Sequence, residues 1–446
     1  MAGMNLNPPN LRRLADVVDM LVDAKVGIVQ HLEMVPCAPG EPDFFEFAAR
    51  ACNTEAFTRE RNFGNTGGAS ASRDLAMAKA IGEAVERYCG AFFDVEELPL
   101  TSASAAPFRC VPPRDFALYS QAQYGEAGFP WVPFEETTPI RWVPAMDPLT
   151  GQTWHVPAAM VYVPYIFYEG SGDAPIVQPI STGLACHMSL AEAAVSGLCE
   201  VIERDAFTLT WQAGLALPQV RAETLSDANF DLVQRFVRAG NSVTILNATT
   251  DLGVPTFLSV LRGDTPARAA LVVAGATDPD PERALCKSLD ELEHTRRFSQ
   301  QIKSNLPRLE REPDYGNIID QVGHLNFWCD HENIGFANFL FASKKRIAFD
   351  EIQGIATGDS RRDLAQVAER ARSLDHRALL VDLTTPDVAS LGFSVVRALI
   401  PGLHPLFMGF RIRAAGGRRL WEVPQRLGYP GIARATGDNP YPHAYP

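Results

Sequence analysis

Apolar residues recur at helical spacing in several long stretches of this chain and cluster in shorter runs between them. The periodicity predicts an amphipathic helix over residues 11–23 and buried helices over about 72–90, 190–212 and 281–301. The shorter runs predict strands at 26–35, 242–247, 255–261 and 269–274, and a hairpin of 142–145 with 154–163. Long helices with short, scattered strands indicate an α/β or α+β fold in which helices cover sheets.

The three buried helices share a local plan. Each follows a glycine-containing segment, such as the polar stretch at 62–70, which we expect to be a loop. A capping residue comes next, and for the first helix this is Ser72 or Asp74. The first two helices also share a short sequence. Glu83, Glu86 and Arg87 of the first recur as Glu200, Glu203 and Arg204 of the second, and the distance along the chain is the same for all three pairs. We therefore expect internally duplicated helix-on-sheet units.

The sequence common to the first two helices is Glu-x-x-Glu-Arg. Positions i, i+3 and i+4 of a helix share a face, so each copy should place two carboxylates and a guanidinium on one stripe. On an exposed helix such a stripe would be a weak ion pair, worth roughly 0.3–0.5 kcal/mol. The flanking residues are apolar in both copies, which indicates burial, and buried carboxylates need partners. Four facing carboxylates would bind a hard divalent cation and, through it, phosphates.

Further polar residues extend these stripes. Glu192 and Ser196 share a helical face with Glu200 and Glu203 because the steps between them are one turn each. The third helix carries Lys287, Glu291 and Arg296, which on their own fit an exposed set of ion pairs equally well.

Composition excludes several classes of protein. The 446 residues carry a net charge of −13 without a long run of like charge, which argues against nucleic-acid binding. No apolar run could span a membrane and no secretory signal is evident, so a cytoplasmic location is expected. The eight cysteines form no Cys-x-x-Cys pair, so neither a disulfide framework nor a zinc site is expected. P-loop, Rossmann, zinc-protease and hydrolase motifs are absent.

Several segments together resemble one family. Residues 181–185, 190–194 and 197–206 resemble the second ATP-binding segment of the YcaO family, 82–88 its first, and 278–285 with Glu291 and Arg296 its third. Residues 382–384, Gly392, 395–397 and 401–403 match the C-terminal half of the family in order. The resemblance covers roughly residues 27–446 and implies an ATP-binding α/β fold. We expect residues 1–60 to pack on a catalytic domain of residues 61–446 with a proline-rich tail at 437–446.

The resemblance implies roles for individual residues. Magnesium would be ligated by Glu83, Glu86, Glu200 and Glu203, while Arg87 and Arg204 would face phosphate oxygens of ATP. The nucleotide would also contact Glu192, Ser196, Lys287, Glu291 and Arg296. Four positions depart from the family pattern, which has Lys, Ser, Asn and Gln where this chain has Ala69, Ala80, Thr182 and His294. These differences affect single nucleotide contacts rather than the four carboxylates.

The sequence of the C-terminal tail indicates which reaction of the family to expect. Azoline-forming members of the family end in a Pro-x-Pro-x-Pro run, and this chain ends Pro-Tyr-Pro-His-Ala-Tyr-Pro. The resemblance implies that the terminal carboxylate of Pro446 is a catalytic base, with His443 as a second candidate. The alternative for this stretch is a disordered proline-rich tail.

Family members activate a backbone amide with ATP. The leading expectation is a cyclodehydratase: a Cys, Ser or Thr side chain of a ribosomal precursor peptide attacks the preceding carbonyl, the oxyanion is phosphorylated, and loss of phosphate leaves a thiazoline or oxazoline. Two alternatives stay open, namely a thioamide-forming enzyme with a TfuA-like partner and a non-catalytic nucleotide-binding scaffold.

The same resemblance implies partners. We expect the chain to lack the N-terminal peptide-clasp domain of fused members, and we expect a separate partner resembling ubiquitin-activating enzymes to present the precursor's leader. A flavin dehydrogenase is a further partner that the resemblance allows. We expect a homo-oligomer or a hetero-complex, and neither nucleic-acid nor membrane partners.

Overall fold

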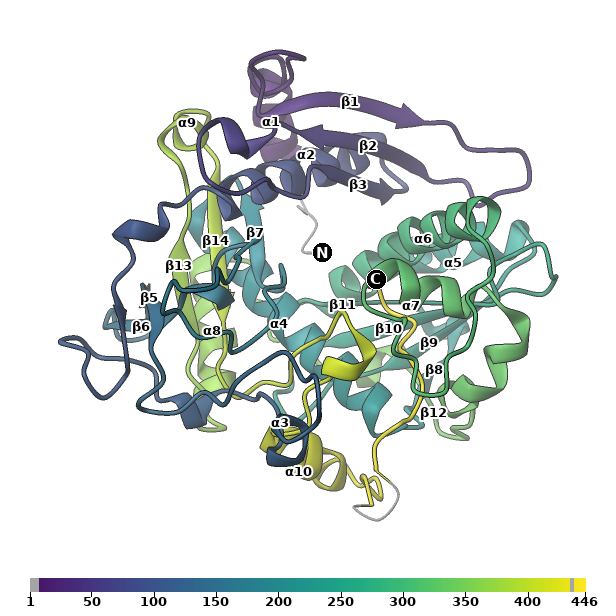
Figure 1. Ribbon diagram of the computed structural model, residues 1–446. Helices are drawn as coiled ribbons and strands as arrows, with labels where there is room; N and C mark the ends of the chain where they lie inside the picture. The colour runs from purple at the N-terminus through teal and green to yellow at the C-terminus, as the bar shows by residue number, and fades with distance from the viewer. Residues whose placement is uncertain (1–7, 434–436) are drawn as a thin grey trace.

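Three sheets form the framework of the chain, and the computed structural model describes it over residues 8–433 and 437–446 (Figure 1). The first sheet has the order β1 (Val29–Val35), β2 (Phe45–Ala51), β3 (Asn65–Ser70). The second has the order β11 (Leu271–Thr277), β10 (Thr256–Arg262), β9 (Ser242–Asn247), β8 (Gln219–Val220), β12 (Arg346–Ile347). The third has the order β4 (Leu100–Thr101), β5 (Ile140–Met146), β13 (Leu379–Asp382), β14 (Ser394–Leu399), β7 (Leu184–His187), with β6 (Thr153–Pro157) paired to β5.

Strand pairing is antiparallel in all three sheets, except that β8 and β12 are parallel. Mostly antiparallel sheets covered by helices define an α+β protein. The predicted mixed helix-and-sheet class is therefore confirmed. The predicted hairpin is the pair β5 and β6.

One long helix comes after an edge strand of each sheet. α2 (Arg73–Gly90) follows β3, α4 (Leu190–Gln212) follows β7, and α6 (Pro281–Asn305) follows β11. Each begins after a side-chain cap, from Ser72, Ser189 and Asp280 respectively. Each helix also contacts the strand of the next unit: α2 meets β7, α4 meets β11 and α6 meets β3. Three strand–cap–helix units therefore close a ring.

The remaining helices pack around this ring. They are α1 (Pro8–Leu21), α3 (Gln121–Tyr124), α5 (Asp227–Arg238), α7 (Gln321–Trp328), α8 (Ser360–Arg372), α9 (Pro386–Ser390) and α10 (Arg418–Arg426). α8 and α10 contact α4, and α5 and α7 contact α6. Within the described ranges no helix has the length and apolar character needed to cross a membrane.

The glycine-rich stretch at 62–70 was predicted as a loop, and this prediction is wrong because most of it is strand β3. A Cβ atom on Gly67 would lie 2.6 Å from a ring carbon of His294, and one on Gly68 would lie 2.4 Å from the Cβ of Lys79. The glycines therefore allow α6 and α2 to approach the strand closely, rather than allowing a turn.

The N-terminal segment, up to residue 60, shares a sheet with the remainder of the chain. β2 lies on one side of the predicted 60/61 boundary and β3 on the other, and the two strands pair along their length. The N-terminal segment thus packs on the rest of the chain through backbone hydrogen bonds as well as side chains. Its first seven residues lie outside the described residues. All eight cysteines are free, and Cys286 is half-buried rather than buried as its apolar helix suggested.

A buried ion pair joins α4 to α10. The Arg419 guanidinium donates to both carboxylate oxygens of Asp205, at 2.8 and 2.7 Å, and the His404 backbone N–H donates to the same carboxylate. Neither side chain of the pair reaches solvent appreciably, since Asp205 is 0% and Arg419 4% exposed.

Replacing Asp205 with alanine should therefore lower the free energy of unfolding by about 3 kcal/mol, because Arg419 would stay buried with only Asp251 left as a partner. Urea denaturation measures this change. The control is Glu422→Ala on α10, where the partners Arg418 and Arg426 are solvent-exposed, and the loss should stay below about 1 kcal/mol. Equal losses in the two variants would contradict the account of this pair.

Candidate functional site

The first Glu-x-x-Glu-Arg stripe lies on α2 and faces inward. Glu83 and Glu86 are buried, which decides against the exposed ion-pair interpretation. Arg87 donates to Glu83 at 3.0 Å, and the Gly67 backbone N–H of β3 donates to the other oxygen of Glu83 at 3.1 Å. Glu86 accepts from the Cys186 backbone N–H of β7 at 2.7 Å. The stripe is thus held between its own strand and the strand of the next unit.

The second stripe, on α4, repeats these contacts. Arg204 donates to Glu200 at 3.0 Å, and the Gly183 backbone N–H before β7 donates to the other oxygen of Glu200 at 3.1 Å. Arg204 also pairs with Glu203. In both units, therefore, the first glutamate joins a backbone N–H of a glycine to the arginine one turn later. The sequence predicted this similarity, and the structure extends it to the hydrogen bonds.

The carboxylates are close enough to influence one another. Burial raises the pKa of Glu86 well above its usual range, and the neighbouring Glu83 and Glu200 raise it further. Burial likewise raises the pKa of Glu203, although Arg204 opposes the change. Carboxyl groups crowded in a dry interior favour a bound cation, because a cation would relieve both their burial and their mutual repulsion.

α6 completes the ring on its third side. Glu291 lies 3.7 Å from the ammonium of Lys79. Burial alone would raise the pKa of Glu291, but Lys79 lowers it, with smaller contributions from His294 and Arg204. Glu291 therefore faces Lys79 of α2 across the ring. His294, one of the four departures from the family pattern, lies among acids: burial lowers its pKa, but Glu46, Glu291 and Glu83 outweigh this and raise it.

Two of the residues predicted to contact the nucleotide are paired with other acidic side chains in this structure. The Arg296 guanidinium donates to both oxygens of Glu293, at 2.7 and 2.8 Å, and also pairs with Glu41. Lys287 donates to Asp278 at 2.8 Å, just before α6 begins. In the arrangement of the described residues neither cation contacts the two stripes, because each is paired with acids of its own region.

The polar residues in the N-terminal part of the α4 face make different contacts from the Glu-x-x-Glu-Arg residues in its middle. Glu192 lies in the first turn, where it accepts from the Ser189 hydroxyl at 2.7 Å and pairs with His187 at 2.8 Å. Ser196 is half-buried. Glu192 therefore belongs to the capping region of α4, about two turns before Glu200.

The C-terminal tail is packed into the molecule beside this cluster. His443, Ala444 and Tyr445 are buried, and the tail carbonyls of Tyr441 and Pro442 accept hydrogen bonds from the indoles of Trp211 and Trp328 at 3.0 Å. The disordered-tail alternative is therefore wrong for residues 437–446. Pro446 is half-buried, and Figure 1 marks the C-terminus beside α6 and β11.

Tyr445 connects the tail to the second stripe. Its hydroxyl donates to Glu203 at 2.6 Å, and the guanidinium of Arg204 lies 4.8 Å from its ring centroid. A Cβ on Gly275 of β11 would lie 2.7 Å from the tyrosine hydroxyl oxygen. The glycine therefore makes room for the contact.

His443 is a poor candidate for a proton shuttle, and the structure corrects that prediction. Its Nε2 donates to the Phe407 carbonyl at 2.8 Å and its Nδ1 accepts from the Tyr445 N–H at 3.2 Å. Its ring stacks on His324 with 3.7 Å between centroids. Burial lowers the pKa of His443 to about 4. Both ring nitrogens are therefore engaged in holding the tail in place.

Lys79 and Tyr445 belong to the site, but sequence reasoning missed both. Lys79 is buried, and its ammonium donates to Asp290 at 2.9 Å and to the Ala69 carbonyl at 3.0 Å. It thus brings a cation from α2 to the position where the family pattern has a lysine and this chain has Ala69. A lysine within an apolar helix was a signal that could have indicated this role.

Replacing Tyr445 with phenylalanine should lower the free energy of unfolding by about 1–3 kcal/mol, because a buried glutamate would lose a hydrogen-bond donor. Chemical denaturation measures the loss. Tyr441→Phe, in the same tail, is the matched control: its ring stacks on Phe336, so the variant should change stability by less than about 0.5 kcal/mol. If the two variants were equally stable, the Tyr445–Glu203 hydrogen bond would not contribute to the stability of the protein.

The glutamates and arginines of the two stripes are compatible with a magnesium ion that is bound together with the phosphates of a nucleotide. In the described part of the chain no three His, Cys, Asp or Glu side chains already enclose one point as a metal cage would. Magnesium commonly keeps several waters and takes one or two carboxylates together with substrate phosphates. The paired glutamates of α2 and α4 fit that mode, with Arg87 and Arg204 beside them for phosphate oxygens.

Comparisons with known proteins identify the family of this chain. A family profile described as a YcaO cyclodehydratase, binding ATP and Mg²⁺, matches residues 67–404. An uncharacterized protein in the tfuA 3′ region of Rhizobium leguminosarum bv. trifolii is 30% identical over 279 residues, which are 60% of this chain and 61% of the relative. This chain therefore aligns with less than two thirds of that protein.

Solved structures share the fold. A heterocyclase in complex with substrate and cofactor matches 99% of this chain and 58% of its own, at a TM-score of 0.80 and 20% identity. YcaO from Methanopyrus kandleri, bound with AMPPCP and Mg²⁺, matches 90% of this chain and 93% of its own, at a TM-score of 0.64 and 18% identity.

Proposed function

Because this chain belongs to the YcaO family, we propose that it is an ATP- and magnesium-dependent cyclodehydratase that converts Cys, Ser or Thr residues of a ribosomal precursor peptide into azolines. The observation that carries the proposal is the repeated contact pattern of the two Glu-x-x-Glu-Arg stripes. Each stripe is buried, each holds its first glutamate on a glycine N–H, and each positions an arginine one turn later. Two matched anion- and cation-binding units suit a metal–nucleotide complex.

In this proposal Glu83, Glu86, Glu200 and Glu203 hold magnesium, and Arg87 and Arg204 bind phosphate oxygens through their planar forks. The ion pairs with Glu83 and Glu200 hold both arginines in place before the nucleotide arrives. Bound magnesium would neutralise charge that develops on the transferring phosphoryl group. The remaining nucleotide contacts from the α4 and α6 faces come from Glu192, Ser196 and Glu291, and from Lys287 and Arg296 if their present partners release them.

The proposed reaction balances with one ATP per ring. The side-chain thiol or hydroxyl adds to the preceding carbonyl carbon and loses its proton to a base. The resulting oxyanion takes the γ-phosphoryl group, and ADP leaves. The amide nitrogen then loses its proton as phosphate departs, which leaves the C=N bond of the azoline.

The base that we propose is the terminal carboxylate of Pro446. Tyr445 is fixed on Glu203, and consecutive Cα atoms are about 3.8 Å apart. The terminal carboxylate therefore directly follows an anchored residue, which limits how far it can move, and a general base has to lie within hydrogen-bond reach of the proton it takes.

Partner proteins belong to the same proposal. A separate peptide-clasp protein would present the precursor's leader and raise the effective concentration of its core at the site. Turnover of a leader-bearing precursor should therefore rise sharply when that protein is added. Equal turnover with and without it would exclude this part of the proposal.

A second candidate is thioamide formation with a TfuA-like partner. The observation that favours it is the gene position of the rhizobial relative, in a tfuA 3′ region. The mass of the product peptide distinguishes the reactions: cyclodehydration removes one water per ring, whereas thioamide formation replaces an oxygen with a sulfur. A peptide that gains sulfur would overturn the azoline proposal. ATP binding without any peptide modification, with precursor and partner both present, would favour a nucleotide-binding scaffold.

A further inference from the structure

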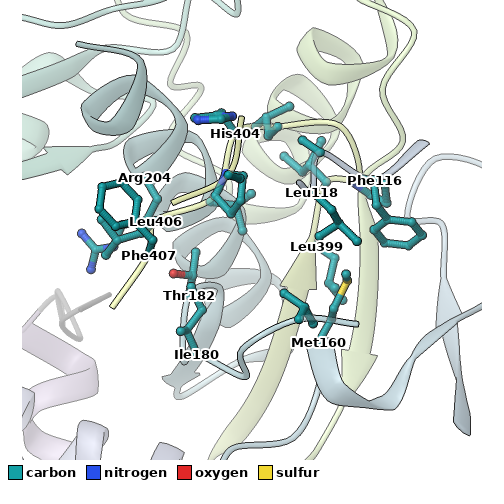
Figure 2. A pocket seen from close by; sticks show the side chains of 18 of the residues that line it. Phe116, Leu118, Met160, Ile180, Thr182, Arg204, Leu399, His404, Leu406 and Phe407 are labelled. Carbon is teal, nitrogen blue, oxygen red and sulfur yellow. The ribbon is translucent and has the colours of Figure 1, made fainter. Parts of the chain in front are cut away.

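An apolar cavity of about 130 Å³ adjoins the second stripe (Figure 2). In Figure 2, Arg204, Leu406 and Phe407 lie on one side of it, and Phe116, Leu118 and Leu399 lie on the other. Arg204 belongs both to this lining and to the carboxylate cluster. One residue of the proposed nucleotide site therefore lines the cavity.

Three polar groups in the lining, Arg397 Nη1, Gln178 Oε1 and His404 Nδ1, are not satisfied by the described residues. Arg397 donates from Nε to the Met160 carbonyl at 2.9 Å and from one terminal nitrogen to the Ile180 carbonyl at 2.7 Å, but its buried Nη1 has no acceptor. The buried Oε1 of Gln178, in the same lining, has no donor. Buried polar groups are nearly always paired, so a spare donor and a spare acceptor in one cavity point to a ligand.

The spare groups match a peptide unit. A peptide group offers one C=O acceptor and one N–H donor, which complement Arg397 and Gln178. Burial lowers the pKa of Arg397 to about 10, while Glu200 acts in the opposite direction. Arg397 shares the cavity lining with Arg204, which pairs with the proposed metal ligand Glu200.

The size and lining of the cavity select an apolar side chain. An engineered protein cavity of about 150 Å³ lined by Leu, Ile and Phe binds benzene, so about 130 Å³ suits a Leu, Ile or Phe side chain. An ammonium would lose its hydration against Leu118, Met160 and Leu399 and would meet the guanidiniums of Arg204 and Arg397 in the same lining. Glycine would leave the space unfilled.

We propose that this cavity binds a large apolar side chain of the peptide substrate, at a residue adjoining the activated amide, while Arg397 and Gln178 hold the neighbouring peptide group. This inference rests on the proposed function only in taking a peptide as substrate. It adds that the enzyme prefers modification sites next to Leu, Ile or Phe.

The test uses N-acetyl-leucinamide, N-acetyl-glycinamide and N-acetyl-aspartamide as probes, with binding to the full-length protein measured by ligand-observed NMR without nucleotide. Burying a leucine side chain should make the first probe bind at least about tenfold more tightly than the other two. In the wild-type protein, a diazirine-bearing leucinamide should label residues 116–119, 160, 177–182 or 397–407. Equal binding of the leucine and glycine probes, or labelling confined to other segments, would overturn the inference.

A cavity-filling variant provides the control. Val177→Phe, in the lining but outside the nucleotide site, should reduce leucinamide binding to the level of glycinamide and leave Mg²⁺-dependent ATP binding unchanged. If the variant is destabilised, the three-probe comparison on the wild-type protein still decides. Normal ATP binding without leucine preference would refute this inference alone, whereas absence of Mg²⁺-dependent ATP binding would refute the proposed function.

Discussion

Replacing Glu200 with glutamine should abolish magnesium-dependent ATP consumption and leave the fold intact. Glutamine preserves the shape of the side chain, but it removes a charged oxygen ligand from the centre of the cluster. Loss of a metal's stabilisation of the transferring phosphoryl group amounts to several kcal/mol, which corresponds to at least about a 100-fold fall in rate. A coupled assay for ADP, with precursor and partner present, measures the fall.

Circular dichroism and thermal melting of the same variant show whether the fold survives. Removing one of several mutually repelling buried carboxylates could even stabilise the nucleotide-free protein. The control is Glu369→Gln on α8, an exposed carboxylate paired with Arg372, which should retain wild-type turnover. If Glu200→Gln consumed ATP normally in a magnesium-dependent way, the metal-site assignment would have to be abandoned.

Appending two residues after Pro446 should reduce azoline formation by about 10²–10⁴-fold, the usual contribution of a general base, and change nucleotide binding little. The extension removes the terminal carboxylate from Pro446, the residue that directly follows the anchored Tyr445. Mass spectrometry of the precursor reports ring formation, and calorimetry reports nucleotide binding.

Pro446→Ala is the matched control, because it keeps a terminal carboxylate at the same position and should retain most of the activity. Deletion of residues 442–446 should also stop ring formation, but it removes the buried His443 and Tyr445 and should destabilise the protein. A C-terminally extended protein that cyclises its peptide at the wild-type rate would exclude a catalytic role for the tail.

The sequence was sufficient to predict the three central helices and the repeated stripe. α2, α4 and α6 begin and end within a few residues of the predicted ranges, because apolar periodicity and serine or aspartate caps are local signals. The inward orientation of Glu83, Glu86, Glu200 and Glu203 was predictable as well, since apolar residues surround them on nearly every side of the helix.

Contacts between distant segments were not predictable in the same way. The glycines of β3 resembled a loop because nothing local indicates that His294 and Lys79 approach them. Arg296 was assigned to the nucleotide, but Glu41, which lies far away in the sequence, pairs with it. His443 was a plausible shuttle by its ordinary pKa alone, and burial of the tail removes that property.

Tyr445 illustrates the same limit. Its role depends on Glu203, on the ring of Phe207 at 4.0 Å between centroids, and on the space left by Gly275. These groups lie on α4 and β11, and only the folded chain brings them to the tail. The proline-rich pattern indicated that the tail is special, but not that its tyrosine is the anchor.

The most direct test of the central claim is a crystal structure of the protein with magnesium and a non-hydrolysable ATP analogue. The account predicts metal ions bound to at least one glutamate of α2 and one of α4, among Glu83, Glu86, Glu200 and Glu203, with phosphate oxygens against Arg87 or Arg204. A nucleotide bound elsewhere, or bound at this place without contact between magnesium and any of these four carboxylates, would contradict it.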